Sequence, residues 1–287
     1  MQYPHTELVL NDKGQVYHLG LSPENVSDKV ILVGDQDRVN LVASFFDSVE
    51  HSSQHREFVC KTGMYQGKRI SAVSTGIGTD NIDITINELD ALFNIDLEKR
   101  EDKKEKTSLT MIRIGTCGIL QPEVPVHSYI LSTHAFGLDN VAHYYDIPFS
   151  AEEAELNTAI NKAVPLPDAI NTYLAKASES VTEKLRSDQT VEGITITSSG
   201  FYGPQGRQLR LPNRTNELNE QLTAFKHGGS RITNFEMESS ALFALGKGLG
   251  HHCGTICLGI ANRPNKNFSK DYSQHMLKLI QYVLDRI

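Results

Sequence analysis

Short apolar runs of strand length recur along the chain, and several of them end at or near a glycine. They cover residues 30–33, 69–74, 110–114, 194–198 and 254–260. A run that is apolar on both faces predicts a central strand, because a strand with one solvated face alternates apolar and polar residues. The pattern therefore predicts a buried sheet with helices on each side.

Apolar positions at helical spacing lie between these runs. Ile82, Ile86, Leu89 and Phe93 share one face of a helix predicted over 81–93, and Met276, Ile280, Val283 and Ile287 form a stripe at the end of the chain. Further helices are predicted over 37–46 and after the capping-box sequence Ser150-Ala151-Glu152-Glu153. This alternation predicts an α/β protein. Without a linker or an internal repeat, we expect a single domain over 1–287.

The charge balance argues against one class of function, general nucleic-acid binding. The 287 residues include 28 Lys and Arg and 35 Asp and Glu, a net charge of −7. A general nucleic-acid binder would be basic, so we expect no nucleic-acid partner. An acidic protein can still bind an anionic small molecule in a positive pocket.

Membrane and secretory segments are not expected. No apolar run approaches the ~18 residues that a membrane span needs, and residues 1–20 lack the apolar stretch of a signal peptide. The four cysteines form no Cys-x-x-Cys pair, which predicts reduced thiols in a cytoplasmic protein. His251, His252, Cys253 and Cys257 could suggest a metal site, but Cys257 lies in an apolar run. We interpret it as a core cysteine and predict no metal site.

The segment 98–106 holds five basic and four acidic residues. A basic arm would not be so evenly neutralised. We expect a solvated loop or a helix extension here.

Two arginines follow or occupy predicted strands. Arg38 comes shortly after Gly34, at the start of a helix, where backbone amides suit an anion. Arg113 lies within an apolar strand, and a buried guanidinium needs a carboxylate or an anionic ligand. A structural salt bridge stays open, although Thr116 and the nearby glycines favour phosphate.

A third candidate is the sequence Asn234-Phe235-Glu236-Met237-Glu238-Ser239, which we expect to begin a helix. Its two carboxylates could hold a diol while Met237 packs against a sugar. The alternative is a helix start enriched in acids that complement the helix dipole.

Five segments of the chain, in order, resemble motifs of the nucleoside phosphorylase family, which includes the uridine and bacterial purine nucleoside phosphorylases. They are 34–38, 53–58, 74–78, 113–116 and 234–239, within a resemblance that runs from about 15 to 263. The sequence Phe201-Tyr202-Gly203-Pro204-Gln205-Gly206-Arg207 is most similar to the uridine-specific branch. The resemblance implies one domain with a mixed, partly barrel-like β-sheet flanked by helices.

The resemblance also implies the site. Gly34, Arg38, Arg113 and Thr116 would bind phosphate, with Arg56 from a neighbouring subunit. Glu236, Met237 and Glu238 would bind ribose, with His18 from the neighbour. Phe201, Gln205 and Arg207 would bind the base, and Arg113, Gln205 and Arg207 would act in catalysis. The implied assembly is a homodimer or a homohexamer (a trimer of dimers) with shared sites.

The implied reaction is reversible phosphorolysis of uridine to uracil and ribose 1-phosphate, with inorganic phosphate as co-substrate and no organic cofactor. A purine enzyme would need an acid where Asn262 stands. A hydrolytic nucleosidase or a non-catalytic nucleoside-binding protein would not need three phosphate arginines.

Three departures from the family pattern stand out. Some relatives bind a monovalent cation with a glutamate, here Glu57, and a serine, but this chain has Thr79-Asp80-Asn81 where the serine would stand. The cation is therefore left open, and we expect Asn81 to cap the next helix. Glycine and proline are also transposed at 203–204, so a surface turn with Gln205 and Arg207 facing water remains the alternative. The charged stretch 98–106 is an insertion.

Overall fold

The computed structural model describes residues 2–215 and 217–287, which fold around a mixed sheet of twelve strands. The strands of this sheet are β1 (Lys29–Val33), β2 (Ser48–His55), β3 (Phe58–Tyr65), β4 (Lys68–Ser74), β7 (Thr110–Ile119), β8 (Tyr129–Gly137), β9 (Tyr173–Lys176), β10 (Thr190–Thr197), β11 (Lys226–His227), β12 (Ser230–Glu236), β13 (His252–Asn262) and β14 (Asn267–Phe268). The α-helices are α1 (Gln36–Ala43), α2 (Thr79–Asn94), α3 (Ala151–Ala163), α4 (Glu179–Leu185), α5 (Leu218–Ala224), α6 (Ser239–Leu249) and α7 (Ser273–Leu284).

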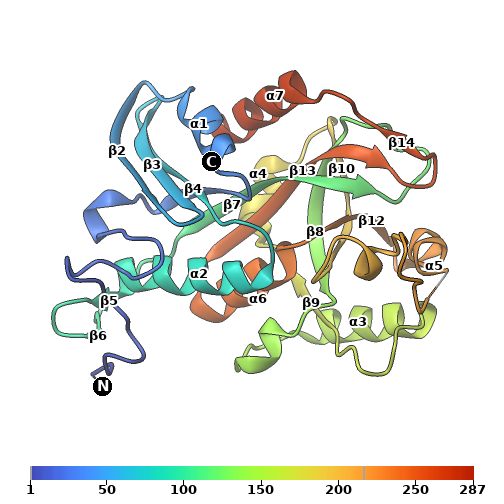
Figure 1. Cartoon of the computed structure of the whole chain (residues 1–287), viewed down its shortest axis with the longest axis horizontal. Helices are drawn as coiled ribbons and strands as arrows, with labels where there is room; N and C mark the ends of the chain where they lie inside the picture. Colours follow the sequence, from blue (N-terminus) through green and yellow to red (C-terminus); the bar gives the residue numbers. More distant parts are fainter. Residues whose placement is uncertain (1, 216) are drawn as a thin grey trace.

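Part of the sheet closes on itself. Strands β12, β10, β8, β13 and β7 are neighbours in that order, and β12 also pairs with β7, which completes a five-stranded barrel. Strand β1 extends the sheet from β7 and is followed by β4, β3 and β2. Figure 1 shows this extension on one side of the molecule and the barrel on the other. The predicted α/β fold with a mixed, partly barrel-like sheet is confirmed.

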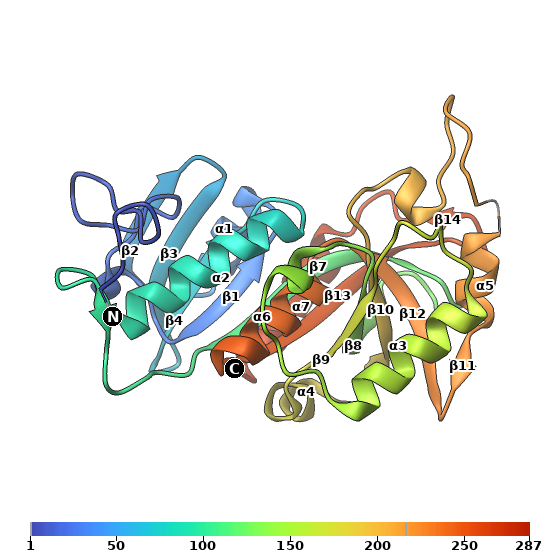
Figure 2. The ribbon, with the colours of Figure 1, turned by 90° about the horizontal axis from the view of Figure 1, so that it is seen from below.

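Helices cover both faces of the extension (Figures 1 and 2). Helices α1 and α7 share one apolar cluster, to which Val39, Val42 and Ile280 contribute. Helices α2 and α6 share another, built around Ile86 and Phe243. Strands β1 and β4 are buried on both faces because these two layers enclose them, whereas β10 packs in a third cluster with α3 and α5.

Several predicted boundaries are wrong. Strand β7 does not stop at Gly115 but continues to Ile119, because it pairs with β13 along this whole length. Asn234 and Glu236 belong to β12, and the helix after them begins only at Ser239. Residue Asn81 does not cap α2: the N-cap is Gly78, and Asn81 lies within the first turn. Tertiary pairing has overridden the local signals.

The charged segment 98–106 is not simply a solvated loop. It contains β6 (Glu101–Asp102), which pairs with β5 (Ile95–Asp96). Between them Arg100 is buried and donates to the carbonyl oxygens of Tyr3, Pro4 and Leu8. The insertion therefore anchors the N-terminal segment, with the buried guanidinium satisfied by backbone acceptors.

Other local predictions hold. The capping box at Ser150 forms with Glu153, and all four cysteines are free and buried, Cys257 within β13. Among the residues that the structure describes, no helix is long and apolar enough to cross a membrane.

Candidate active site

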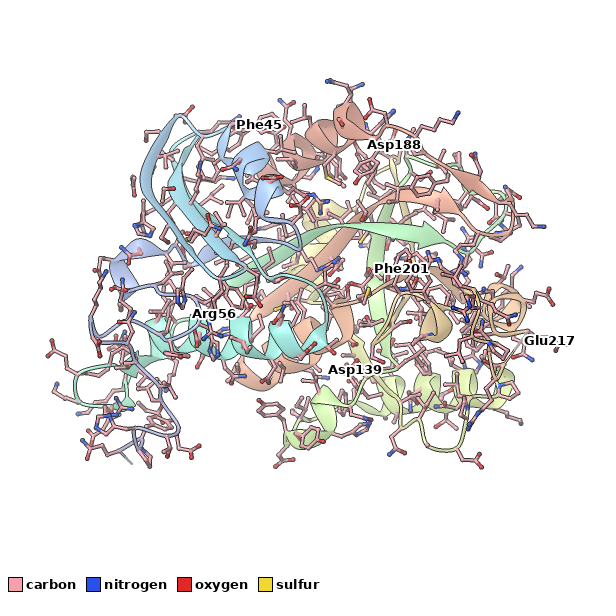
Figure 3. The ribbon with its side chains drawn as sticks, viewed as in Figure 1. Phe45, Arg56, Asp139, Asp188, Phe201 and Glu217 are labelled. Carbon is pink, nitrogen blue, oxygen red and sulfur yellow. The ribbon has the colours of Figure 1, made fainter. Side chains whose placement is uncertain are left out.

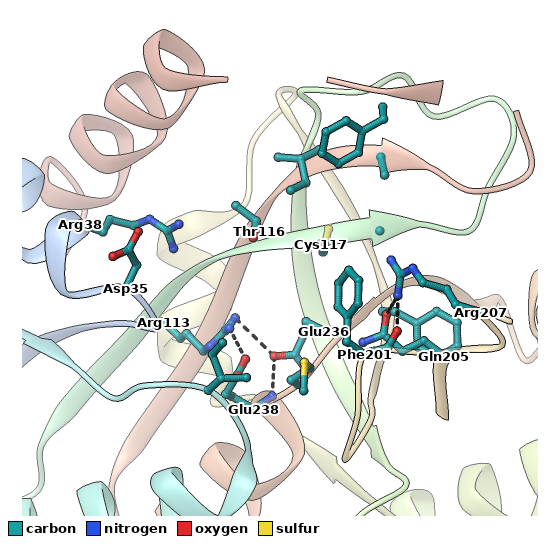
Figure 4. A pocket seen from close by; sticks show the side chains of 18 of the residues that line it. Asp35, Arg38, Arg113, Thr116, Cys117, Phe201, Gln205, Arg207, Glu236 and Glu238 are labelled. Carbon is teal, nitrogen blue, oxygen red and sulfur yellow. Dashed lines mark hydrogen bonds and ion pairs between the residues drawn. The ribbon is translucent and has the colours of Figure 1, made fainter. Parts of the chain in front are cut away.

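A cavity of about 1000 Å³ opens where strands β1, β4, β12 and β13 end, with β7 along its wall. Ten of the twelve predicted site residues line it, and they come from four separate segments of the chain. They are Gly34, Arg38, Arg113, Thr116, Phe201, Gln205, Arg207, Glu236, Met237 and Glu238. Figure 4 shows Arg38 and Arg113 at one end of the cavity and Gln205 and Arg207 at the other.

At the first end, Arg38 reaches in from the start of α1. Asp35 caps this helix by accepting from the amide of Asp37 over 2.9 Å, so that amide is already satisfied. The guanidinium of Arg38 is buried and lies 3.4 Å from the carbonyl oxygen of Ile114. Burial, and then the charge of Arg113, lower the pKa of Arg38. Because the positive charges of Arg38 and Arg113 disfavour each other, an anion bound between them would be stabilised.

Arg113 is paired with two carboxylates. Its guanidinium forms ion pairs with Glu238 and, over 3.3 Å, with Glu236. Burial opposes the charge of Arg113, but Glu238 and then Glu236 outweigh it, so the pKa of Arg113 is raised. A Cβ on Gly115 would clash with this guanidinium, so glycine leaves room for it. The salt bridge that the sequence left open is present, in the wall of the cavity.

The two carboxylates have different surroundings. Glu236 accepts from the Thr197 hydroxyl over 2.5 Å and from the backbone amides of Glu238 and Ser239, so it caps the start of α6. Glu238 accepts from the amide of Gly78 over 2.8 Å. Burial raises the pKa of Glu238, and Glu236 adds to this against the opposing charge of Arg113. Glu238 has fewer partners than Glu236 and keeps lone pairs that can accept from hydroxyl groups in the cavity.

The other end is built by the loop after β10. Arg207 donates to the side-chain oxygen of Gln205 and, over 2.6 Å, to the carbonyl oxygen of Phe201. Its guanidinium carbon lies 3.8 Å from the centre of the Phe201 ring. Gln205 is only 3% exposed, so the alternative in which this residue faces water is wrong.

The sequence reasoning missed Arg263 as a site residue. It follows β13 directly and lines the cavity. Its Nη1 is buried and has no hydrogen-bond partner in the part of the chain that the structure describes. Burial, and then the charge of Arg207, lower the pKa of Arg263 to about 10. The only available signal was its place after an apolar strand, close to Asn262.

Asn262 has a structural partner. Its side-chain amide donates to the carbonyl oxygens of Gln121 and Val124 over 2.9 and 2.8 Å.

Glu57 and Asn81 also contribute to the wall of the cavity. A monovalent cation near Glu57 stays a prediction.

Two predicted residues, His18 and Arg56, do not line the cavity of their own chain. Arg56 is exposed, and its guanidinium lies 3.4 Å from the Tyr17 hydroxyl and 5.3 Å from the ring centre. His18 is partly exposed, with Nδ1 2.7 Å from a carboxylate oxygen of Glu88. In Figure 3, Arg56 and Phe201 are labelled well apart from each other. Tyr17 connects the two: its ring meets that of His18 and the guanidinium of Arg56, and neither of these two residues belongs to the cavity lining.

Comparison with known proteins identifies the family. The curated uridine phosphorylase of Thermococcus kodakarensis is 29% identical over 262 residues, which cover 90% of this chain and 82% of that protein. A solved structure, described as a Trypanosoma brucei nucleoside phosphorylase with uridine phosphorylase activity, is 29% identical with a TM-score of 0.88, covering 98% of this chain and 100% of that one. A DeoD-type purine nucleoside phosphorylase of Roseobacter denitrificans is 28% identical over 229 residues, 79% of each chain. The family profile described as the phosphorylase superfamily matches residues 28–287, and the chain belongs to that superfamily.

Proposed function

We propose that this protein is an enzyme that catalyses the reversible phosphorolysis of uridine to uracil and ribose 1-phosphate. One observation carries the proposal: a single cavity holds two arginines beside two carboxylates at one end, and a glutamine–arginine pair at the other. That arrangement suits an anionic nucleophile, a diol and a polar base edge, in this order. The reaction needs inorganic phosphate and no organic cofactor.

Phosphate is held between Arg38 and Arg113, with Thr116 and the backbone at Gly34 beside it. Bound there, its negative charge offsets the mutual repulsion of the two guanidinium groups. Glu238 accepts hydrogen bonds from the ribose hydroxyls, and Met237 packs against the sugar. A phosphate oxygen forms a bond to the anomeric carbon as the bond from that carbon to the base nitrogen breaks.

The base leaves with the bonding electron pair. Negative charge therefore gathers on uracil in the transition state, next to Arg207 and Arg263. Neither arginine forms an ion pair with a carboxylate among residues 2–215 and 217–287. The two cations therefore stabilise this charge more than they stabilise the neutral substrate, and such differential binding accelerates the reaction. Gln205 can both donate to and accept from the edge of a pyrimidine, whereas the corresponding edge of a purine lies on a second fused ring, farther from the ribose.

A direct assay tests the proposal. Release of free base from uridine and inosine is measured with and without phosphate. We expect release of base only with phosphate. We also expect kcat/KM for uridine to be at least ~100-fold above that for inosine, because the wrong base leaves polar groups of the site without hydrogen-bond partners. Equal rates would instead favour the purine-type reaction, and release without phosphate would favour a nucleosidase.

We further propose that His18 and Arg56 complete the site of a second subunit, in a dimer or a trimer of dimers. Their grouping outside their own cavity supports this, as does the exposure of Arg56. The buried, free cysteines are consistent with action in the cytoplasm.

Mixing two inactive proteins tests the shared site. We expect His18→Ala and Arg38→Ala to be inactive alone. When they are mixed under conditions that exchange subunits, some mixed dimers contain one intact site, and activity returns. Wild-type activity from a monomer in sedimentation would contradict the shared site, and His18→Ala mixed with Arg56→Ala serves as the control that should not recover.

A further inference from the structure

The loop that carries Gln205 and Arg207 contacts the side chain of Asn219, on α5. In the amide orientation that satisfies both neighbours, Nδ2 of Asn219 donates to the carbonyl oxygen of Gln205 over 3.2 Å, and Oδ1 accepts from Nη2 of Arg263 over 3.0 Å. One carboxamide thus links the loop to the guanidinium that follows β13. A carboxamide is uncharged and offers a donor and an acceptor in one planar group.

The backbone of the loop packs directly on Asn219. Gly206 has φ +67°, and a Cβ at this position would lie 2.7 Å from the amide group of Asn219. Glycine adopts this left-handed conformation without steric cost. The amides of Gly206 and Arg207 are in turn held by the carbonyl oxygens of Gly203 and Tyr202, over 2.9 and 2.8 Å.

Helix α5 is a firm support for this contact. Leu218 and Leu222 are buried in the apolar core of the barrel region. The Thr223 hydroxyl lies 2.7 Å from the carbonyl oxygen of Asn219 and 3.0 Å from that of Leu120. A side chain at 219 is therefore fixed relative to β7, which ends just before Leu120.

The neutrality of Asn219 matters as much as its hydrogen bonds. Arg207 and Arg263 repel each other, and an acceptor must hold Arg263 without cancelling its charge. A carboxylate at 219 would form an ion pair with Arg263 and would repel the carbonyl oxygen of Gln205. An apolar side chain would release both groups.

We propose that Asn219 is a positioning residue for base recognition, one that holds the Gln205–Arg207 loop and Arg263 in place while leaving their positive charge free for the departing base. The role rests on the proposed function. It adds a residue outside the cavity, on a helix that no predicted motif includes.

Three variants test the role. Asn219→Ala and Asn219→Asp change the proposed residue, and Asn213→Ala, in the loop that carries Gln205 and Arg207, is the matched control. A misplaced binding group can cost on the order of 100-fold, so we expect kcat with uridine to fall at least ~10-fold in Asn219→Ala. We expect a larger fall in Asn219→Asp despite its closer shape. The KM for phosphate should stay within about twofold in all three, because phosphate lies at the other end of the cavity.

Amide hydrogen exchange measures, in the absence of substrate, whether Asn219 holds the loop in place. The amides of Gly206 and Arg207 should exchange faster in Asn219→Ala than in the wild type or in Asn213→Ala. Asn219 variants with wild-type kcat, or an Asp variant more active than the Ala variant, would overturn the role while the proposed function stands. A wild type that does not phosphorolyse uridine would refute the proposed function and this role with it.

Discussion

Replacing Arg113 by methionine is expected to cost both stability and activity. The change leaves Glu236 and Glu238 buried without their cation, and breaking a buried pair from one side typically costs about 3–5 kcal/mol. Loss of a charged contact to the attacking anion should lower kcat/KM for uridine by roughly 1,000-fold, about 4 kcal/mol. Chemical denaturation and steady-state kinetics at varied phosphate measure the two effects.

A second variant separates them. Arg113→Met combined with Glu238→Gln removes one of the two unpaired charges, so the free energy of unfolding should recover in part. Because Glu238 also binds ribose, the reference is Glu238→Gln alone, and phosphate-dependent turnover of the double variant should stay far below it, since the cation is still missing. If activity returned together with stability, Arg113 would be only a structural partner of the two carboxylates.

The sequence was informative where chemistry lies at the end of a strand. Arg38 and Arg113 are polar residues beside or within apolar runs, and the cavity contains both. The strands themselves could be predicted because apolar runs buried on both faces have few alternatives. Their ends were less predictable, since pairing with β13 keeps β7 extended through two glycines that are local breakers.

The parts that the sequence missed depend on closure of the fold. Arg263 joins the base end only because β13 and β10 both pair with β8 in the barrel. Arg100 is buried only because residues 3–8 return to cover it. Asn219 contacts residues on either side of it in the chain, at 205 and 263, and no local pattern encodes such a contact. Composition and periodicity describe neighbours along the chain, and these three residues act through neighbours in space.

Replacing Arg207 by methionine is expected to reduce turnover and leave phosphate binding intact. Arg207 is half-buried, and desolvation lowers its pKa, against an opposing effect of Tyr202. A partly desolvated cation interacts strongly with charge that develops beside it. Removing one such preorganised donor typically costs about 10²–10³ in kcat, and we expect a loss in this range with uridine. Arg214→Met, a change in the same loop at a residue that lines a neighbouring hollow, is the matched control.

The substrate can test the cause of this loss. An electron-withdrawing substituent at position 5 makes uracil a better leaving group, so its departure depends less on an external cation. The loss caused by Arg207→Met should therefore be smaller with 5-fluorouridine than with uridine, whereas a loss through disordered binding would be equal for both. The KM for phosphate should change by less than about twofold, because Arg38 and Arg113 lie at the opposite end of the cavity. Equal losses for the two nucleosides, or an unchanged kcat, would show that Arg207 does not stabilise the leaving base.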